Sequence, residues 1–221
     1  MLVTDRADGD ARPPVRSSSR RTAPGAPAAG AGATPAWTLV RQVHGDHVVV
    51  VTAPSGPLAV DADAIVTMAP LTPLAVLGAD CALLGLASAE GPIAAVHAGW
   101  RGALGGVVER AVDAMRALGA VEISAVLGPC IHAECYEFGE GDLDVVAASF
   151  GDVVRSATAS GRPSLDLPKV VERSLARAGV PAPREIGTCT SCDRRWYSHR
   201  ARAETGRHAL VISRGQAGEV A

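Results

Sequence analysis

The stretch Val96-His97-Ala98-Gly99-Trp100-Arg101-Gly102 joins the end of an apolar run to the start of a helical pattern. Residues 92–96 before it are nearly all apolar, which is typical of a strand buried on both faces. After Gly102, apolar side chains recur at helical spacing through Leu118, and Gly119 is a C-cap signal. The stretch therefore predicts a strand followed by a helix, with an imidazole and a guanidinium near the junction.

Other segments show similar patterns on both sides of this junction. Strands are expected at 37–43, 47–52, 74–77, 81–87, 92–96, 121–127, 184–188 and 209–213, and helices at 103–118, 142–150 and 166–178. This mixed order favours an α/β or α+β fold, with mixed β-sheets layered with helices. His44 then lies between two strands, whereas Cys81 and His97 lie at strand ends.

The chain of 221 residues is long enough for one large domain. Residues 1–36 are rich in Pro, Gly, Ala, Ser and Arg, which predicts a mostly flexible N-terminal segment, although a short strand at 1–4 would fit a sheet edge. We expect a single catalytic domain at 37–216.

Composition narrows the classes of partner. The chain is 48% hydrophobic and 20% charged, as expected of a soluble globular protein. Its net charge is −2, and no basic stripe occurs beyond the N-terminal arginines, which argues against nucleic acid and membrane surfaces. The longest apolar region, 74–100, is interrupted by Asp80 and Glu90. We therefore expect a cytoplasmic protein with a small-molecule partner; composition does not predict its oligomeric state.

Three residues form a first candidate metal site: His44, Cys81 and His97. Imidazole nitrogen and thiolate sulfur are preferred zinc ligands, and three protein ligands leave a coordination position open for catalysis. Their spacing matches no compact zinc motif, so a buried cysteine and hydrogen-bonded core histidines are an alternative interpretation.

Cysteines supply a rival site. The pair Cys189 and Cys192, together with Cys130 and Cys135, would close a four-thiolate structural zinc site. The C-x-x-C pair also suggests a redox role, but that motif normally follows the first strand of its fold, and here it lies late in the chain. Simple packing of the cysteines around a loop is slightly favoured over both interpretations.

Two further clusters suit an anion. Arg101 lies beside the first turn of the expected helix from Ala103, where its guanidinium and free backbone N–H groups would hold phosphate, unless it is a solvated surface arginine. The runs Tyr197-Ser198-His199-Arg200 and Thr205-Gly206-Arg207 gather cations and hydroxyls, as in an anion or sugar pocket, or in an ordinary charged loop.

Eight runs, in this order, resemble the YfiH-like family, also called the multicopper polyphenol oxidase or laccase-domain family, which includes zinc-dependent purine nucleoside phosphorylases. They span residues 39–213 approximately: Gln42-Val-His44-Gly45, Asp61-Ala-Asp63-Ala, Ala79-Asp80-Cys81, His97-Ala-Gly-Trp-Arg101-Gly, Leu127-Gly-Pro129-Cys130, Cys135-Tyr136-Glu137, Cys189-x-x-Cys192 and Thr205-Gly206-Arg207. The chain departs from the family pattern at His132 and His199, and no Ser-Leu-Asn run occurs in residues 5–36.

The resemblance implies a YfiH-like sandwich in which His44, Cys81 and His97 hold Zn²⁺, and in which the later cysteines are not zinc ligands. It also implies a pocket where the metal meets a nucleoside and phosphate. Asp80 is then a candidate for proton transfer or for support of the ligands, or else a strand-end cap. The candidate substrate contacts are Gln42, Arg101, Ser198, Arg200, Thr205 and Arg207.

The function expected from this resemblance is phosphorolysis of adenosine or inosine, with adenosine deamination as a second activity. A copper-dependent phenol oxidase is the first alternative, and Cu²⁺ is less expected because a multicopper centre needs far more imidazoles than the six scattered histidines of this chain. The others are a hydrolase that edits cell-wall precursors, using either the zinc site or Cys81 as a nucleophile, and a non-enzymatic module stabilised by zinc.

Overall fold

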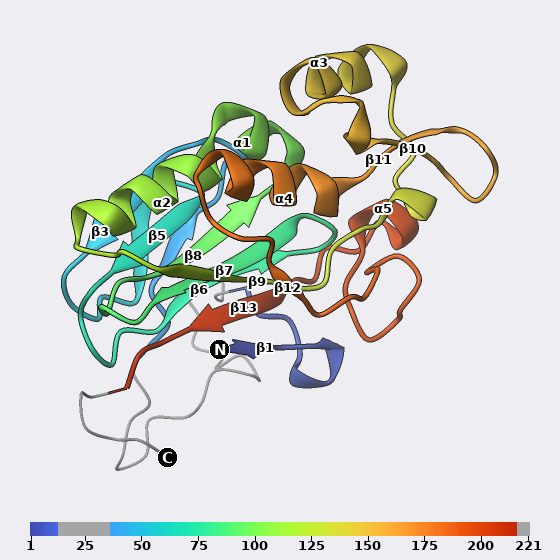
Figure 1. Cartoon of the computed structure of the whole chain (residues 1–221). Helices are drawn as coiled ribbons and strands as arrows, with labels where there is room; N and C mark the ends of the chain where they lie inside the picture. Colours follow the sequence, from blue (N-terminus) through green and yellow to red (C-terminus); the bar gives the residue numbers. More distant parts are fainter. Residues whose placement is uncertain (13–35, 216–221) are drawn as a thin grey trace.

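The computed structural model describes residues 1–12 and 36–215 and arranges them in three layers (Figure 1). A six-stranded sheet forms the middle layer. Its strand order is β12 (Arg184–Glu185), β9 (Ile123–Leu127), β7 (Ala82–Ser88), β8 (Ile93–Ala98), β5 (Ala64–Thr67) and β3 (Val48–Val51). The outer pairs β3–β5 and β9–β12 are parallel and the inner pairs are antiparallel, so the sheet is mixed.

Helices cover one face of this sheet (Figure 1). Helix α2 (Val107–Ala117) lies against β3, β5 and β8, and α4 (Leu167–Arg177) packs on α2 and β7. The short α1 (Trp100–Gly105) and α3 (Glu140–Phe150) extend the layer towards the hairpin of β10 (Arg155–Ala157) and β11 (Pro163–Leu165). Across the described ranges, no helix combines the length and apolarity needed to cross a bilayer.

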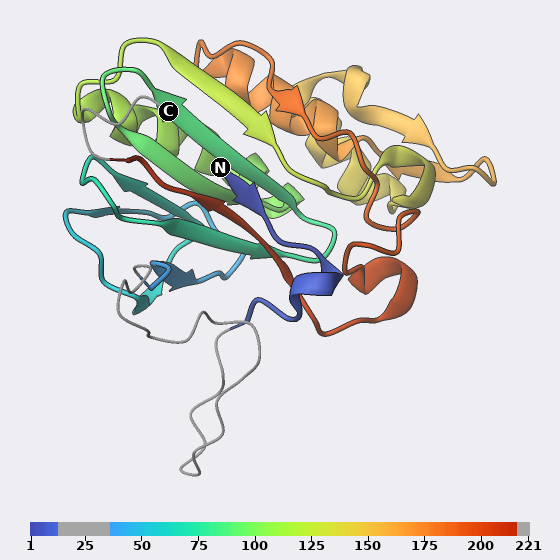
Figure 2. The same ribbon diagram turned by 90° about the horizontal axis from the view of Figure 1, so that it is seen from below.

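A smaller sheet covers the other face (Figure 2). It has the order β1 (Leu2–Val3), β13 (His208–Ile212) and β6 (Leu74–Gly78), and its apolar side chains pack against β5, β7 and β8. A separate parallel pair is formed by β2 (Leu39–Arg41) and β4 (Pro57–Asp61). Because β5 and β8 are enclosed by both layers, every residue of both strands is buried.

The expected fold class, mixed sheets layered with helices, is confirmed. The strand expected at 1–4 pairs with β13 as an edge strand. Residues 13–35 of the segment expected to be flexible lie outside the described residues. Strands β4 and β5 were not predicted, although β5 is central to the fold.

The expected single helix from Ala103 to Leu118 was wrong in two respects. The helix begins earlier, at Trp100, so that Arg101 lies inside its first turn. It is then interrupted at Gly106, whose φ of 93° is left-handed and whose N–H bonds back to the carbonyls of Ala103 and Gly102. A left-handed glycine ends one helix and lets α2 start in a new direction.

Candidate functional site

Three separate segments bring His44, Cys81 and His97 together. His44 lies in the loop between β2 and β3, Cys81 directly precedes β7, and His97 lies near the end of β8. Strands β7 and β8 are antiparallel, with Leu83 opposite His97, so Cys81 lies at the same end of the sheet as His97. One ligand atom from each of the three residues lies within 4.8 Å of the others.

The donor atoms suit a metal ion. Cys81 Sγ lies 3.8 Å from His44 Nε2, and the rings of His44 and His97 meet edge to face with centroids 4.8 Å apart. Ligands about 2.0–2.3 Å from a tetrahedral zinc ion are themselves separated by somewhat less than 4 Å. These two imidazoles and one thiolate, called the three-ligand set below, could hold one metal ion and leave a fourth position for a non-protein ligand.

Asp63 holds two of these ligands in place. Its Oδ1 lies 2.7 Å from His97 Nδ1, which leaves Nε2 as the ring nitrogen available to a metal. The same carboxylate accepts backbone N–H bonds from Val43, His44 and Gly45 at 3.2, 3.0 and 2.7 Å. Asp63 is fully buried and follows β4. It therefore orients one ligand through its ring and another through its backbone.

The backbone is strained beside the ligands. His44 has a φ of 61° and Asp80, the neighbour of Cys81, has a φ of 99°, both in the left-handed region that favours glycine. Such conformations cost about 1–3 kcal/mol each and persist only where the surroundings enforce them. Asp63 provides that enforcement for His44.

Electrostatics favour a thiolate at this position. Burial raises the pKa of the Cys81 thiol, but the nearby His97 and His44 lower it more, to about 6. Burial lowers the pKa of His97, whereas the Cys81 charge and the hydrogen bond to Asp63 raise it, to about 9. The thiolate is the form of cysteine that binds metals and attacks electrophiles.

Aromatic and cationic side chains adjoin the three-ligand set. Tyr136 and Trp100 each contact Phe138 edge to face, with centroids 5.3 and 5.2 Å apart. The Arg101 guanidinium lies over Trp100, and that of Arg200 lies over Tyr136. Burial and the charge of Cys81 raise the pKa of Tyr136, while Arg200 and Arg101 lower it, so the phenol lies within the electrostatic influence of the thiolate and of both cations.

The remaining residues predicted as substrate contacts have partners within the chain. Both ends of the Gln42 amide bond to the backbone of Leu77, and the Ser198 hydroxyl caps α5 (His199–Arg202). The Arg207 guanidinium binds the carbonyls of Glu204, Thr205 and Gly206. Among the described residues, no hydrogen bond links Thr205 or Arg207 to the three-ligand set.

Asp80 connects two loops. Its Oδ1 accepts a hydrogen bond from the Thr190 hydroxyl at 2.7 Å, and its Oδ2 accepts one from the backbone N–H of Arg200 at 2.6 Å. Both carboxylate oxygens are thus engaged by groups that position α5 and the loop of Thr190 against Cys81. This geometry favours support of the ligands over proton transfer.

The later cysteines only partly form the rival cluster expected from the sequence. Cys135, Cys189 and Cys192 converge, but the fourth member is Glu134, not Cys130. Cys130 is buried, and its backbone forms a parallel bridge with Cys189.

Sequence reasoning assigned no role to Asp63, Tyr136 or Glu134. The first two lie in runs that carry the family resemblance, Asp61-Ala-Asp63-Ala and Cys135-Tyr136-Glu137, and this was the available signal for them. Glu134 directly precedes the second run and had no such signal.

The glycines of the opening stretch allow close approach at the site. A Cβ on Gly102 would lie 2.7 Å from the carbonyl oxygen of Gly45, the residue after His44. We therefore expect Gly102→Ala to displace the His44 loop, to weaken metal binding and to destabilise the fold by about 1–3 kcal/mol. Urea unfolding and chelator competition measure both effects.

Gly141→Ala is the matched control, because a Cβ at this position in α3 meets nothing within 4 Å. It should stabilise the protein by roughly 0.5–1 kcal/mol and leave metal affinity unchanged. Equal behaviour of the two variants would show that the contact between Gly102 and Gly45 is unimportant.

Comparison with known proteins supplies independent evidence of the family to which the chain belongs. The sequence model of the family described as multi-copper polyphenol oxidoreductase laccase matches residues 4–215. A Mycobacterium tuberculosis protein named purine nucleoside phosphorylase is 40% identical over 176 residues, which cover 78% of this chain and 70% of that protein. A Deinococcus radiodurans protein of the same name is 39% identical and covers 99% of this chain and 85% of its own length.

Solved structures agree with the fold. YlmD from Geobacillus stearothermophilus superposes with a TM-score of 0.72 at 28% identity, over 83% of this chain and 75% of that one. The Bacillus licheniformis hypothetical protein YfiH gives a TM-score of 0.71 at 28% identity, over 80% of this chain and 74% of that one. Both similarities extend over most of the layered sheets and helices described above.

Proposed function

Because the chain belongs to the multi-copper polyphenol oxidoreductase laccase family, in which relatives about 40% identical to it are named purine nucleoside phosphorylase, we propose that it is a zinc-dependent purine nucleoside phosphorylase. Its substrates are adenosine or inosine together with phosphate, and deamination of adenosine is a second activity of the same site. The observation that carries the proposal is the convergence of His44, Cys81 and His97 within 4.8 Å, beside aromatic rings and two arginines.

Different residues of the chain have different roles in the proposed reaction. His44, Cys81 and His97 would hold zinc, which supplies a Lewis acid with an open coordination position when bound. Asp63 fixes the ring of His97, and Asp80 fixes the loops around Cys81. Because these ligands are already held in position, the protein does not need to reorganise during the reaction.

Phosphate and nucleoside need different partners. Arg101 and Arg200 present guanidinium groups, which bind phosphate through paired charge-assisted hydrogen bonds. Tyr136 keeps its hydroxyl proton, since burial raises its pKa, and can donate a hydrogen bond to the purine. In the reaction a phosphate oxygen bonds to the anomeric carbon, the bond to the purine nitrogen breaks, and its electron pair leaves with the purine, which takes a proton from solvent.

The test combines elemental analysis with turnover of inosine and adenosine, with and without phosphate. We expect bound zinc, ribose 1-phosphate formed only with phosphate, and at least about a 100-fold loss of activity in His97→Ala, since even loss of a group supporting a ligand costs up to that much. His47→Ala is the matched control, because His47 is exposed, bonds to the Asp61 carbonyl and is not part of the three-ligand set.

Different outcomes identify different functions. Release of base without phosphate would make the protein a hydrolase, and bound copper with phenol oxidation would make it an oxidase, since one thiolate and two imidazoles also suit copper. Zinc-free protein with full turnover would defeat the proposal.

A second candidate is hydrolysis with Cys81 as nucleophile, which is one of the two chemistries open to an enzyme that edits cell-wall precursors. The order Cys81, His97, Asp63 is that of a nucleophile, its base and the group that orients the base. Chelation separates the two functions, because it should abolish a zinc-dependent activity but preserve or raise the activity of a free thiolate.

A further inference from the structure

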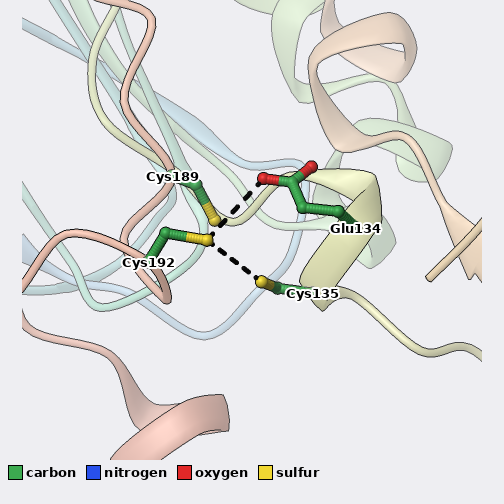
Figure 3. A group of neighbouring side chains, drawn as sticks. All are labelled: Glu134, Cys135, Cys189 and Cys192. Atoms are coloured by element: carbon green, nitrogen blue, oxygen red, sulfur yellow. Dashed lines mark hydrogen bonds between the residues drawn. The ribbon is translucent and has the colours of Figure 1, made fainter. Parts of the chain in front are cut away.

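A second cluster of metal-binding side chains lies apart from His44, Cys81 and His97. It consists of Glu134, Cys135, Cys189 and Cys192, whose ligand atoms all lie within 4.8 Å of one another. Figure 3 shows the four side chains pointing towards a common centre, with Cys192 contacting both Cys135 and Glu134. Two come from the 3-10 turn Ala133–Cys135 and two from the loop after β12.

The family resemblance implies that the later cysteines are not zinc ligands. From their geometry in this chain we infer instead that these four residues bind a zinc ion, which closes a structural site and joins the two segments. Three thiolates favour zinc and other borderline or soft metals over magnesium, calcium and manganese, which prefer oxygen ligands. Four protein ligands leave no coordination position free, which is the arrangement of structural zinc sites. This site does not depend on the function proposed for the first one.

The distances fit such an ion. Cys192 Sγ lies 3.3 Å from Cys135 Sγ and 3.9 Å from Glu134 Oε1. Zinc–sulfur bonds of about 2.3 Å in a tetrahedron separate two sulfur atoms by about 3.8 Å, so shifts of a few tenths of an ångström suffice. A disulfide between Cys135 and Cys192 would require the sulfurs to close to about 2.05 Å and would leave Cys189 and Glu134 without a role.

A backbone N–H group points at one sulfur atom of the cluster. The backbone N–H of His132 donates to Cys189 Sγ at 3.4 Å. Burial raises the pKa of Cys189, and backbone N–H groups of His132, Cys192 and Ser191 oppose that rise. Such N–H donors pointing at sulfur suit a thiolate bound to a metal.

The cluster is open to solvent and lies on a loop held by hydrogen bonds. Cys135 and Ser191 border an open cleft of about 570 Å³, which gives an ion a path from solvent. The Arg202 guanidinium binds the carbonyls of Ser191 and Thr190, which fixes the loop that carries Cys189 and Cys192, and Glu204 balances its charge.

A zinc ion bound by these four residues would also fix side chains that lie beside His44, Cys81 and His97. Tyr136 follows Cys135 directly, and Thr190 follows Cys189 and bonds to Asp80, the neighbour of Cys81. The two metals would therefore be linked through short stretches of chain, although each has its own ligands.

The test counts zinc in the full-length protein after loading and removal of loosely bound metal. We expect about two zinc ions per chain in the unmodified protein, and about one in both Cys135→Ser/Cys192→Ser and His44→Ala/His97→Ala. Cys130→Ala is the matched control, since Cys130 is equally buried beside Cys189 but outside the cluster, and it should retain two.

Two further measurements locate the ion. With cobalt in place of zinc, the sulfur-to-metal absorption should fall mainly in the cysteine variant, because three of the four thiolates lie in this cluster. If that variant fails to fold, Glu134→Gln on a His97→Ala background serves instead, since Glu134 is exposed, and it should lower the remaining zinc affinity at least about tenfold.

One zinc ion per chain that is lost completely in His97→Ala would overturn the inference. So would a disulfide between Cys135 and Cys192 that survives zinc loading, detected by mass spectrometry without reductant.

Discussion

Asp63→Asn is expected to lower metal affinity by about 10–100-fold, the usual cost of removing a group that orients a metal ligand. The carboxylate accepts the His97 ring N–H and three backbone N–H groups from the His44 loop. An amide of the same shape has one accepting oxygen, so its NH₂ group must face either the ring N–H or the loop. Each buried donor left without an acceptor costs about 1–3 kcal/mol, so stability should fall by about 3 kcal/mol as well.

Chelator competition and urea unfolding measure the two effects. Asp61→Asn is the matched control, because Asp61 lies two residues away, is exposed and pairs with the exposed Arg41, an arrangement that contributes little. If Asp63→Asn binds metal within a factor of about three of the unmodified protein, Asp63 does not orient the ligands as inferred.

Asp63 also marks the limit of sequence reasoning. The three metal-capable residues could be proposed from residue type and strand position, and the structure does bring them together. The role of Asp63 could not be proposed in this way, because it depends on the register in which β5 pairs with β8 and on the left-handed conformation of His44. Neither is encoded in a local pattern.

The elements were predictable where a periodic signal was strong. Helix α4 begins where the Asp166 N-cap and the proline after it indicated, since the Asp166 side chain accepts the N–H of Lys169. Strand β5 was missed because Ala64-Ile-Val-Thr is only four residues long and closely follows β4 with a short connection. Its burial comes from the two layers that enclose it, which is tertiary information.

The later cysteines also show which features the sequence predicts and which depend on the three-dimensional structure. Sequence reasoning could pair Cys189 with Cys192 by their spacing, but it chose Cys130 as a fourth ligand by residue type. The backbone turns Cys130 into the core and places Glu134 at the cluster instead. Direction of a side chain on an irregular segment is set by the turn, which a count of cysteines does not reveal.

His208 should make the fold sensitive to acid. Its side chain is fully buried in β13 against Trp196, and neither ring nitrogen has a hydrogen-bond partner among the described residues. Burial lowers its pKa from 6.5 to about 4, and the backbone of Pro129 and the charge of Asp80 oppose this only in part. One pKa unit corresponds to about 1.4 kcal/mol. Excluding the proton from His208 therefore makes the free energy of unfolding depend on pH by about 3 kcal/mol.

The direction of the effect follows from which state binds the proton. Below pH 6.5 the unfolded chain takes up a proton on His208 that the folded protein excludes until about pH 4, so stability is lost as the pH falls through that window.

We expect the His208→Phe variant, which keeps a ring beside Trp196, to lose about 3 kcal/mol less stability than the unmodified protein between pH 7 and pH 4 in urea unfolding. The metal ligands are common to both proteins, so their titration cancels in the difference. His199→Gln removes an exposed imidazole instead and should keep the original dependence. If His208→Phe loses as much stability as the unmodified protein, a different group causes the acid sensitivity.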